Sequence, residues 1–159
     1  MGMDVYGLKP ADTKGEYFRN NVWWWRPLAE YVLSAAPLLH NKVGIGGQGW
    51  EYNDGDGLNA EDSLALAKIL RVDLEEGKTL AYEEARKKKL ANLPDQECSI
   101  CEGTGKREAP PKMGKGTHPC KACDKTGKIE HWARSYPFDM ANVEEFAEFL
   151  ENCGGFKIN

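Results

Sequence analysis

The sequence predicts an α+β fold, a small body of helices and short strands interrupted by an inserted hairpin module. Three observations indicate this. Capped helical segments lie on both sides of a cysteine-rich stretch, and short extended segments lie near both ends of the chain. The cysteine-rich stretch contains a sequence motif that occurs twice, and we call each copy a phrase. We therefore assign residues 1–94 and 131–159 to the body and residues 95–130 to the module.

The N-terminal part of the body is expected to hold a strand, a helix and a turn region. Residues 3–6, MDVY, predict a short strand. Pro27 fits best as the first residue of a helix over about 27–36, because a proline deeper inside a helix loses a backbone hydrogen bond and clashes with the preceding turn. Residues 44–57 contain too much glycine for a regular helix and suit turns around a short strand at 50–52.

Two helices are predicted after the glycine-rich stretch. Asn59 is a natural N-cap for the first, which should end near Gly77. The apolar residues expected on its buried face are Leu64, Ala67, Leu70 and Leu74. Thr79 is predicted to cap the second helix, over residues 80–93, which ends before a proline.

A last helix and a strand complete the body. Asn142 and Glu145 have the spacing of a capping box, so the helix is predicted to begin near Asn142 and to run to about Asn152. Residues 156–158 are expected to add an edge strand.

The repeated phrase predicts a metal site. Residues 98–106 read CSICEGTGK and residues 120–128 read CKACDKTGK. Each phrase holds a Cys-x-x-Cys pair, and 18 residues separate the pairs, a spacing typical of structural zinc sites with four thiolate ligands. The candidate ligands are Cys98, Cys101, Cys120 and Cys123. We therefore expect a zinc hairpin with one four-cysteine site and one structural zinc ion.

Other ligands and other uses of the cysteines are weaker interpretations. His118 lies two residues before Cys120 and is a second candidate ligand, but four thiolates already complete a tetrahedral site. A redox dithiol would need a helix N-terminus to lower a thiol pKa, and neither pair has one. Cys153 stands outside the repeat and is expected to be a plain, half-buried cysteine.

The string Cys-x-x-Cys-x-Gly-Thr-Gly resembles the cysteine-rich zinc repeat of the DnaJ (Hsp40) chaperones. Those chaperones carry four such repeats that form two zinc sites, and this chain has two repeats, enough for one site. The resemblance covers residues 98–128 and implies the zinc hairpin and its ligands. Lys125 replaces the first glycine of the second copy, and the His-Pro-Asp motif of the J-domain is absent, so chaperone activity is not implied.

The segment between the two pairs, residues 106–119, is rich in Pro, Gly and Lys. Such a composition cannot bury itself, so we expect an exposed, mobile loop.

Charge is distributed unevenly along the chain. Residues 86–134 carry 12 Lys or Arg against 6 Asp or Glu, whereas the net charge of the whole chain is −4. A basic region of this kind is one way to bind nucleic acid, with an affinity that falls as salt rises. The candidate residues are Arg86, Lys87, Lys88, Lys89, Lys106, Arg107, Lys121 and Lys128. Against this hypothesis, the rest of the chain is acidic and shows no known base-reading motif.

A run of three tryptophans is the candidate surface for a protein partner. Trp23, Trp24 and Trp25 cannot all face one core, so at least one should be partly exposed. Exposed tryptophan anchors protein interfaces, and Arg26 could stack on an indole ring. The alternative is that two of the rings belong to the core and the third covers the glycine-rich loop.

Catalysis is not expected. The sequence has no GxSxG elbow, no P-loop, no HExxH motif and only three scattered histidines, at positions 40, 118 and 131. A zinc ion with four cysteine ligands also keeps no open coordination position.

The chain lacks an apolar run long enough to cross a membrane and lacks the features of a secretory leader, so a cytoplasmic location is expected.

A second resemblance covers more of the chain. It is carried by three stretches, GEYFRNNVWWWRPLAEYV, NDGDGLNAEDSLALA and YPFDMANVEEFAEFLENCGGF, with the cysteine segment between the last two. These stretches are similar to small uncharacterised proteins of bacteriophages and prophages. This resemblance implies a phage source and not a mechanism. Small phage proteins often act by binding a host component, so a phage source favours a binding protein, for example one that modulates a host defence factor. The leading hypothesis is therefore a non-catalytic zinc-binding protein that acts by binding another protein, and the alternative is a nucleic-acid-binding accessory protein.

Overall fold

The computed structural model describes residues 2–37 and 50–159 and shows an α+β chain with two compact units. The first unit comprises Met1–Lys87 and Tyr136–Asn159, and the second unit comprises Lys88–Ser135. His40 and the glycine-rich residues 44–49 lie outside the described residues. None of the helices in the described ranges is long and apolar enough to cross a membrane.

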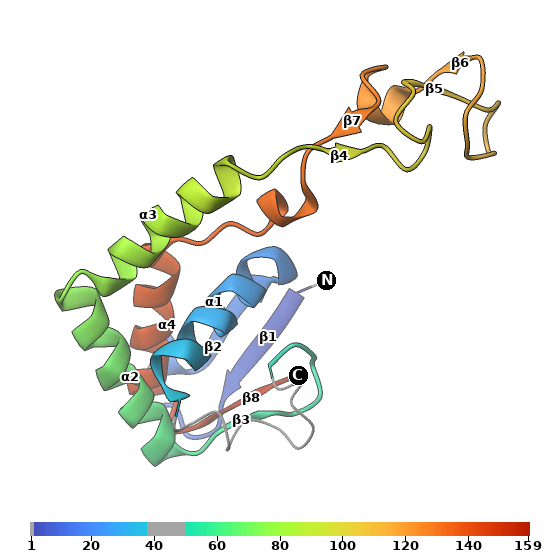
Figure 1. Cartoon of the computed structure of the whole chain (residues 1–159). Helices are drawn as coiled ribbons and strands as arrows, with labels where there is room; N and C mark the ends of the chain where they lie inside the picture. The colour runs from blue at the N-terminus through green and yellow to red at the C-terminus, as the bar shows by residue number, and fades with distance from the viewer. Residues whose placement is uncertain (1, 38–49) are drawn as a thin grey trace. The chain divides into compact units, whose positions relative to one another are not determined.

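The first unit contains an antiparallel sheet of four strands in the order β2-β1-β8-β3 (Figure 1). The strands are β1 (Gly2–Gly7), β2 (Tyr17–Asn21), β3 (Gly57–Leu58) and β8 (Phe156–Ile158). The predicted N-terminal strand is confirmed, and the strand predicted at 50–52 is wrong, because Trp50 lies in a turn with φ 59°. The C-terminal strand is not an edge strand, since β3 pairs with its outer side and matches Leu58 with Phe156.

Helix α1 (Val22–Ala35) begins before Pro27, not at it. The side-chain oxygen of Asn21 accepts hydrogen bonds from the backbone N–H groups of Trp23 and Trp24 at 3.0 and 3.2 Å, which is an N-cap that the sequence analysis missed. Pro27 therefore lies inside the helix, where it cannot donate to the carbonyl of Trp23. Burial of the Pro27 ring and the cap of Asn21 offset that loss.

Helix α2 (Ala60–Glu75) has the predicted N-cap, because Asn59 Oδ1 accepts from the Asp62 N–H at 2.8 Å. Its buried face is turned relative to the prediction. Leu66 is buried, whereas Leu64 has an exposed fraction of 46%. The helix ends at Glu75, close to the expected Gly77, which has φ 73°.

Helix α3 (Lys78–Ala91) begins before Thr79, so Thr79 is not its cap. The Thr79 side chain is fully buried, and its hydroxyl lies 2.8 Å from the hydroxyl of Tyr31. Thr79 therefore joins α3 to α1. The boundary between the two compact units falls within α3, after Lys87.

Helix α4 (Met140–Asn152) starts at a different cap from the predicted capping box. Asp139 accepts from the Ala141 N–H at 2.8 Å, while Asn142 accepts from the side-chain amide of Asn20 at 2.7 Å. A buried carboxylate, Glu83 of α3, accepts from the Met140 N–H at 2.7 Å. Two carboxylates thus face the positive end of α4.

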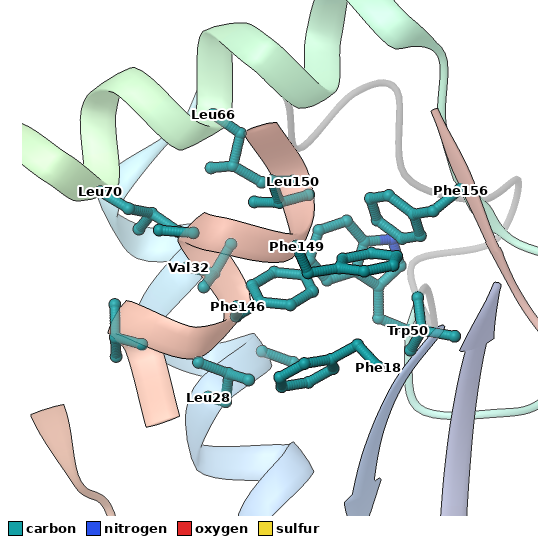
Figure 2. Close-up of a cluster of buried hydrophobic side chains, with 14 of the residues drawn as sticks. Phe18, Leu28, Val32, Trp50, Leu66, Leu70, Phe146, Phe149, Leu150 and Phe156 are labelled. Carbon is teal, nitrogen blue, oxygen red and sulfur yellow. The ribbon is translucent and has the colours of Figure 1, made fainter. Parts of the chain in front are cut away.

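One hydrophobic core lies between the helices and the sheet (Figure 2). Aromatic rings from distant segments meet there, with ring centroids 5.0 Å apart for Phe18 and Phe146 and 5.4 Å apart for Trp50 and Phe156. The other labelled side chains around them are Leu28, Val32, Leu66, Leu70, Phe149 and Leu150. Alternate residues of the strands point into this core, as in a sheet covered on one face.

The second unit is built from short ladders around the cysteines. Strand β4 (Gln96–Glu97) pairs with β7 (Lys128–Ile129), and β5 (Lys106–Arg107) pairs with β6 (His118–Pro119), both antiparallel (Figure 1). Its 3₁₀ turns are η3 (Lys121–Cys123) and η4 (Trp132–Ser135).

Candidate metal centre

The four cysteines of the repeated phrase meet in the second unit. Their sulfur atoms all lie within 4.8 Å of one another, and all four side chains are buried. Sγ of Cys98 lies 3.9 Å from Sγ of Cys120, and Sγ of Cys101 lies 3.7 Å from Sγ of Cys123. The predicted ligand set therefore converges on one point, and His118 is not part of it.

The sulfur arrangement fits a tetrahedral zinc ion. Zinc–sulfur bonds of about 2.3 Å place the corners of a tetrahedron about 3.8 Å apart, which matches the two measured sulfur–sulfur distances. Thiolate is also the ligand that zinc prefers in structural sites. Cys98, Cys101, Cys120 and Cys123 would hold the ion, and its contribution there is to stabilise the fold of the second unit.

Each phrase folds into the same turn around its cysteine pair. The N–H of Gly105 donates to Sγ of Cys101 at 3.3 Å, and the N–H of Gly127 donates to Sγ of Cys123 at 3.3 Å. These two backbone N–H groups offset negative charge on the sulfurs and fix their direction. The duplication in the sequence thus supplies two equal halves of one site.

A threonine closes each turn. Thr104 Oγ1 donates to the carbonyl of Cys101 at 2.7 Å, and Thr126 Oγ1 donates to the carbonyl of Cys123 at 2.6 Å. Both hydroxyls also accept from the backbone N–H two residues later. The two threonines occupy matching positions of the repeat, and this match could have indicated their role, but the sequence alone led to no role for them.

The two halves interlock through glycines. The N–H of Cys98 donates to the carbonyl of Gly127 at 2.9 Å, and the N–H of Cys120 donates to the carbonyl of Gly105 at 3.0 Å. A Cβ atom on Gly105 would lie 2.1 Å from the carbonyl oxygen of Lys125. No residue with a side chain fits at this crossing without moving the backbone, so Gly105 and the matching Gly127 are sterically required.

Lys125 keeps the backbone conformation of the glycine that it replaces. Its φ is 68°, and the matching Gly103 has φ 76°. A lysine adopts this left-handed conformation only at a cost in free energy. The substitution of Lys125 for glycine therefore changes the residue type and leaves the turn intact.

Two neighbouring thiols, those of Cys98 and Cys120, differ in pKa. Burial raises the pKa of Cys98, but backbone N–H groups of Cys101 and Ile100 and the neighbouring thiols lower it more, to about 7. Burial, together with the hydrogen bonds shared with the other cysteines, raises the pKa of Cys120 to about 11, although the backbone N–H of Ala122 acts in the opposite direction. Four sulfurs this close cannot all carry negative charge without a cation, and a divalent metal ion supplies the counter-charge that makes them thiolates.

Residues 106–119 are mostly exposed, as predicted, and their backbone forms a hydrogen-bonded hairpin. The N–H of Gly116 donates to the carbonyl of Lys106 at 3.3 Å, and the N–H of Gly114 donates to the carbonyl of Ile100 at 3.0 Å. Backbone pairing can order a segment that has no core of its own, which a judgement from composition does not capture.

The three tryptophans have three different environments, all in the first unit. Trp25 is 1% exposed, Trp24 is half-buried, and Trp23 is 47% exposed. The prediction that they cannot all face one core is confirmed. Trp23 packs against Tyr136 with ring centroids 4.9 Å apart, and Arg26 donates to the Tyr136 hydroxyl at 3.1 Å. Tyr136 was missed, because no local pattern links residues more than 100 positions apart.

The eight basic candidates for nucleic-acid binding are divided between the two units. Arg86 is paired in the first unit with Glu30 at 3.2 Å, and Lys87 with Glu83. The remaining lysines are exposed and belong to the second unit: Lys88, Lys89, Lys106, Lys121 and Lys128. Arg107, also in the second unit, is half-buried.

The assignment of the metal centre rests on its geometry alone, because comparison with known proteins adds no relative. No family model, curated protein or solved structure matches the chain.

Proposed function

We propose that this protein is a non-catalytic zinc-binding protein that acts by binding another protein. The observation that carries the proposal is the closed set of four buried sulfurs. All four positions of a tetrahedral ion are taken by the chain itself, so the ion has no position for a substrate or a reactive water. The metal then serves to order the second unit as a rigid recognition element.

An aromatic group around the exposed Trp23 of the first unit supports a protein partner. Trp23, Tyr136 and Arg26 lie together, with the Arg26 guanidinium carbon 5.9 Å from the centre of the Tyr136 ring. Tryptophan, tyrosine and arginine are the residues that carry most binding energy at protein interfaces. We call these three residues the Trp23 surface. A host protein, including a defence factor if the chain is phage-encoded, is the class of partner that we propose for it.

The experiment is capture of partners from a bacterial lysate with three forms of the full chain. Trp23→Ala removes the centre of the Trp23 surface, and Tyr52→Ala removes an aromatic side chain of similar exposure elsewhere, 50% for Tyr52. We expect a protein that the wild type and Tyr52→Ala retain and Trp23→Ala loses. Equal capture by all three forms would show that the Trp23 surface is not the binding site.

Nucleic-acid binding is the second candidate, favoured by the eight exposed lysines of the second unit. Acidic residues interrupt them: Lys88–Ser135 carries ten Lys or Arg and six Asp or Glu. If nucleic acid is the ligand, the affinity for an oligonucleotide should fall steeply between about 50 and 200 mM salt. Absence of binding at the lower concentration would exclude this candidate.

A further inference from the structure

The second unit has a pocket of about 310 Å³ beside the β5–β6 ladder. Its lining comes from both strands, from the loop between them and from the second cysteine turn: Arg107, Pro110, His118, Pro119 and Lys121. No aspartate or glutamate belongs to this lining. The pocket is therefore positively charged although acidic residues are common elsewhere in the second unit.

The backbone around the pocket holds Arg107 in place. Arg107 is opposite His118 in the ladder, and its guanidinium donates through Nε to the carbonyl of Glu108 at 3.3 Å and through Nη2 to the carbonyl of Lys112. Its third nitrogen, Nη1, has no hydrogen-bond partner among the residues that the structure describes. An arginine fixed in this way keeps donors for a ligand and loses little side-chain entropy on binding.

The chemistry of the lining selects a carboxylate on a short apolar stem. Arg107 and Lys121 are basic side chains, and charge-assisted hydrogen bonds to a carboxylate are stronger than neutral ones. Pro110 and Pro119 offer rigid apolar surface that suits the methylene groups of a glutamate. We infer that this pocket, which we call the Arg107 pocket, binds a glutamate side chain in an acidic segment of the partner, an inference that rests on the proposed function.

An extended polyanion fits this surface less well than an acidic peptide. Nucleic acid needs a continuous basic track with aromatic rings for stacking, and no Phe, Tyr or Trp lines the Arg107 pocket. Carboxylates flank the pocket in the sequence at Glu108 and Asp124. These charges would repel neighbouring phosphates, whereas a peptide can place neutral residues beside its glutamates.

The repeat itself provides a matched pair of variants. Lys121→Ser puts in the residue that the first phrase has at the same place, Ser99, and removes one charge from the Arg107 pocket. Lys125→Gly puts in the matching Gly103, removes the same charge and leaves the lining of the pocket unchanged. Both variants should keep the turn, because the other half of the site already folds with these residues.

The test is fluorescence anisotropy with the zinc-loaded full chain. The probe is a labelled dodecapeptide of alternating Glu and Ala, compared with its Gln–Ala counterpart and with a twelve-nucleotide oligothymidylate. We expect binding of the glutamate peptide only, weakened about tenfold or more by Lys121→Ser and less than about twofold by Lys125→Gly. Zinc content and circular dichroism of both variants show that the second unit is intact.

Three results would overturn the inference: no binding of the glutamate peptide, equal loss in the two variants, or tighter binding of the oligonucleotide than of the peptide. These results differ from failure of the proposed function. If Lys121→Ser retains the partner captured from lysate at wild-type strength, the partner is real and the Arg107 pocket is not its site.

Discussion

At the scale of single residues, the metal centre depends on glycines as much as on cysteines. Gly105 and Gly77 both adopt left-handed conformations, with φ 72° and 73°. A Cβ atom on Gly105 would meet a backbone oxygen at 2.1 Å, whereas a Cβ atom on Gly77 would meet nothing within 4 Å. The two glycines therefore share the same backbone strain upon substitution and differ in steric clash.

This difference makes Gly105→Ala and Gly77→Ala a controlled comparison. Gly105→Ala should push the two phrases apart and lower zinc affinity by about tenfold or more, because it also displaces the N–H that donates to Cys101 Sγ. Gly77→Ala should leave zinc affinity unchanged and cost only the strain of its turn, about 1–2 kcal/mol. Competition with a chromophoric chelator measures both affinities. Equal affinities would mean that the crossing of the phrases does not hold the ligands in position.

At the scale of elements, helix α3 helps to start helix α4. Glu83 is buried, with 8% of the residue exposed, and its carboxylate accepts from the Met140 N–H at 2.7 Å. Burial raises the pKa of Glu83, but the ion pair with Lys87 and the hydrogen bond from Met140 lower it more, so its pKa lies below the ordinary value of 4.5. A carboxyl group with a lowered pKa stabilises the folded state above its unfolded-state pKa, and this stabilisation disappears as the pH falls through the folded-state value.

Glu83→Gln should therefore lower the free energy of unfolding at pH 7 by about 1–2 kcal/mol, since the charged cap and the ion pair are both lost. As the pH falls through the folded-state pKa of Glu83, the difference from the wild type should shrink, because Glu83 then becomes protonated in both states of the wild type. Urea unfolding at neutral and acid pH measures the two differences. Glu84→Gln is the control, because Glu84 is exposed, and an equal effect of the two variants would contradict the capping role of Glu83.

Helix starts show what sequence reasoning could and could not predict at this scale. Asn59 was the strongest local cap signal in its segment and is the cap. Asn21 and Asp139 are equally good cap residues, but Pro27 and the Asn142–Glu145 spacing gave competing local signals. Tertiary contacts decided between them. The Tyr31–Thr79 hydrogen bond and the two-residue strand β3 likewise depend on partners distant in sequence.

At the scale of the whole molecule, the metal centre was predictable because its information is local. Residue type and spacing within 98–128 specify four ligands, and the repeat specifies that its two halves are alike. The Trp23 surface and the Arg107 pocket were not predictable as units. Tyr136 reaches Trp23 across more than 100 residues, and Lys121 joins Arg107 only after the phrases fold against each other.

The two units differ in what holds them together. The core of the first unit contains more than twenty buried side chains, among them Phe146 and Leu70. The buried cluster of the second unit consists of the four cysteines, with only Ile100 and Ile129 packed beside them. So few apolar groups cannot offset the conformational entropy of about 50 residues, which is why small modules of this kind fold around a metal.

Removal of zinc should consequently unfold the second unit and leave the first unit folded. In hydrogen exchange on the full chain, a chelator should abolish the protection of amides such as Cys98 and Cys120, whose N–H groups donate across the two phrases, while amides of α2 and α4 stay protected. Cys101→Ser should have the same effect without chelator and bind less than about half an equivalent of zinc. Cys153→Ser should retain one equivalent, because Cys153 is buried in the core of the first unit. Protection at Cys98 and Cys120 that survives the chelator would mean that backbone pairing alone orders the repeat. Zinc would then not be required for the second unit to fold.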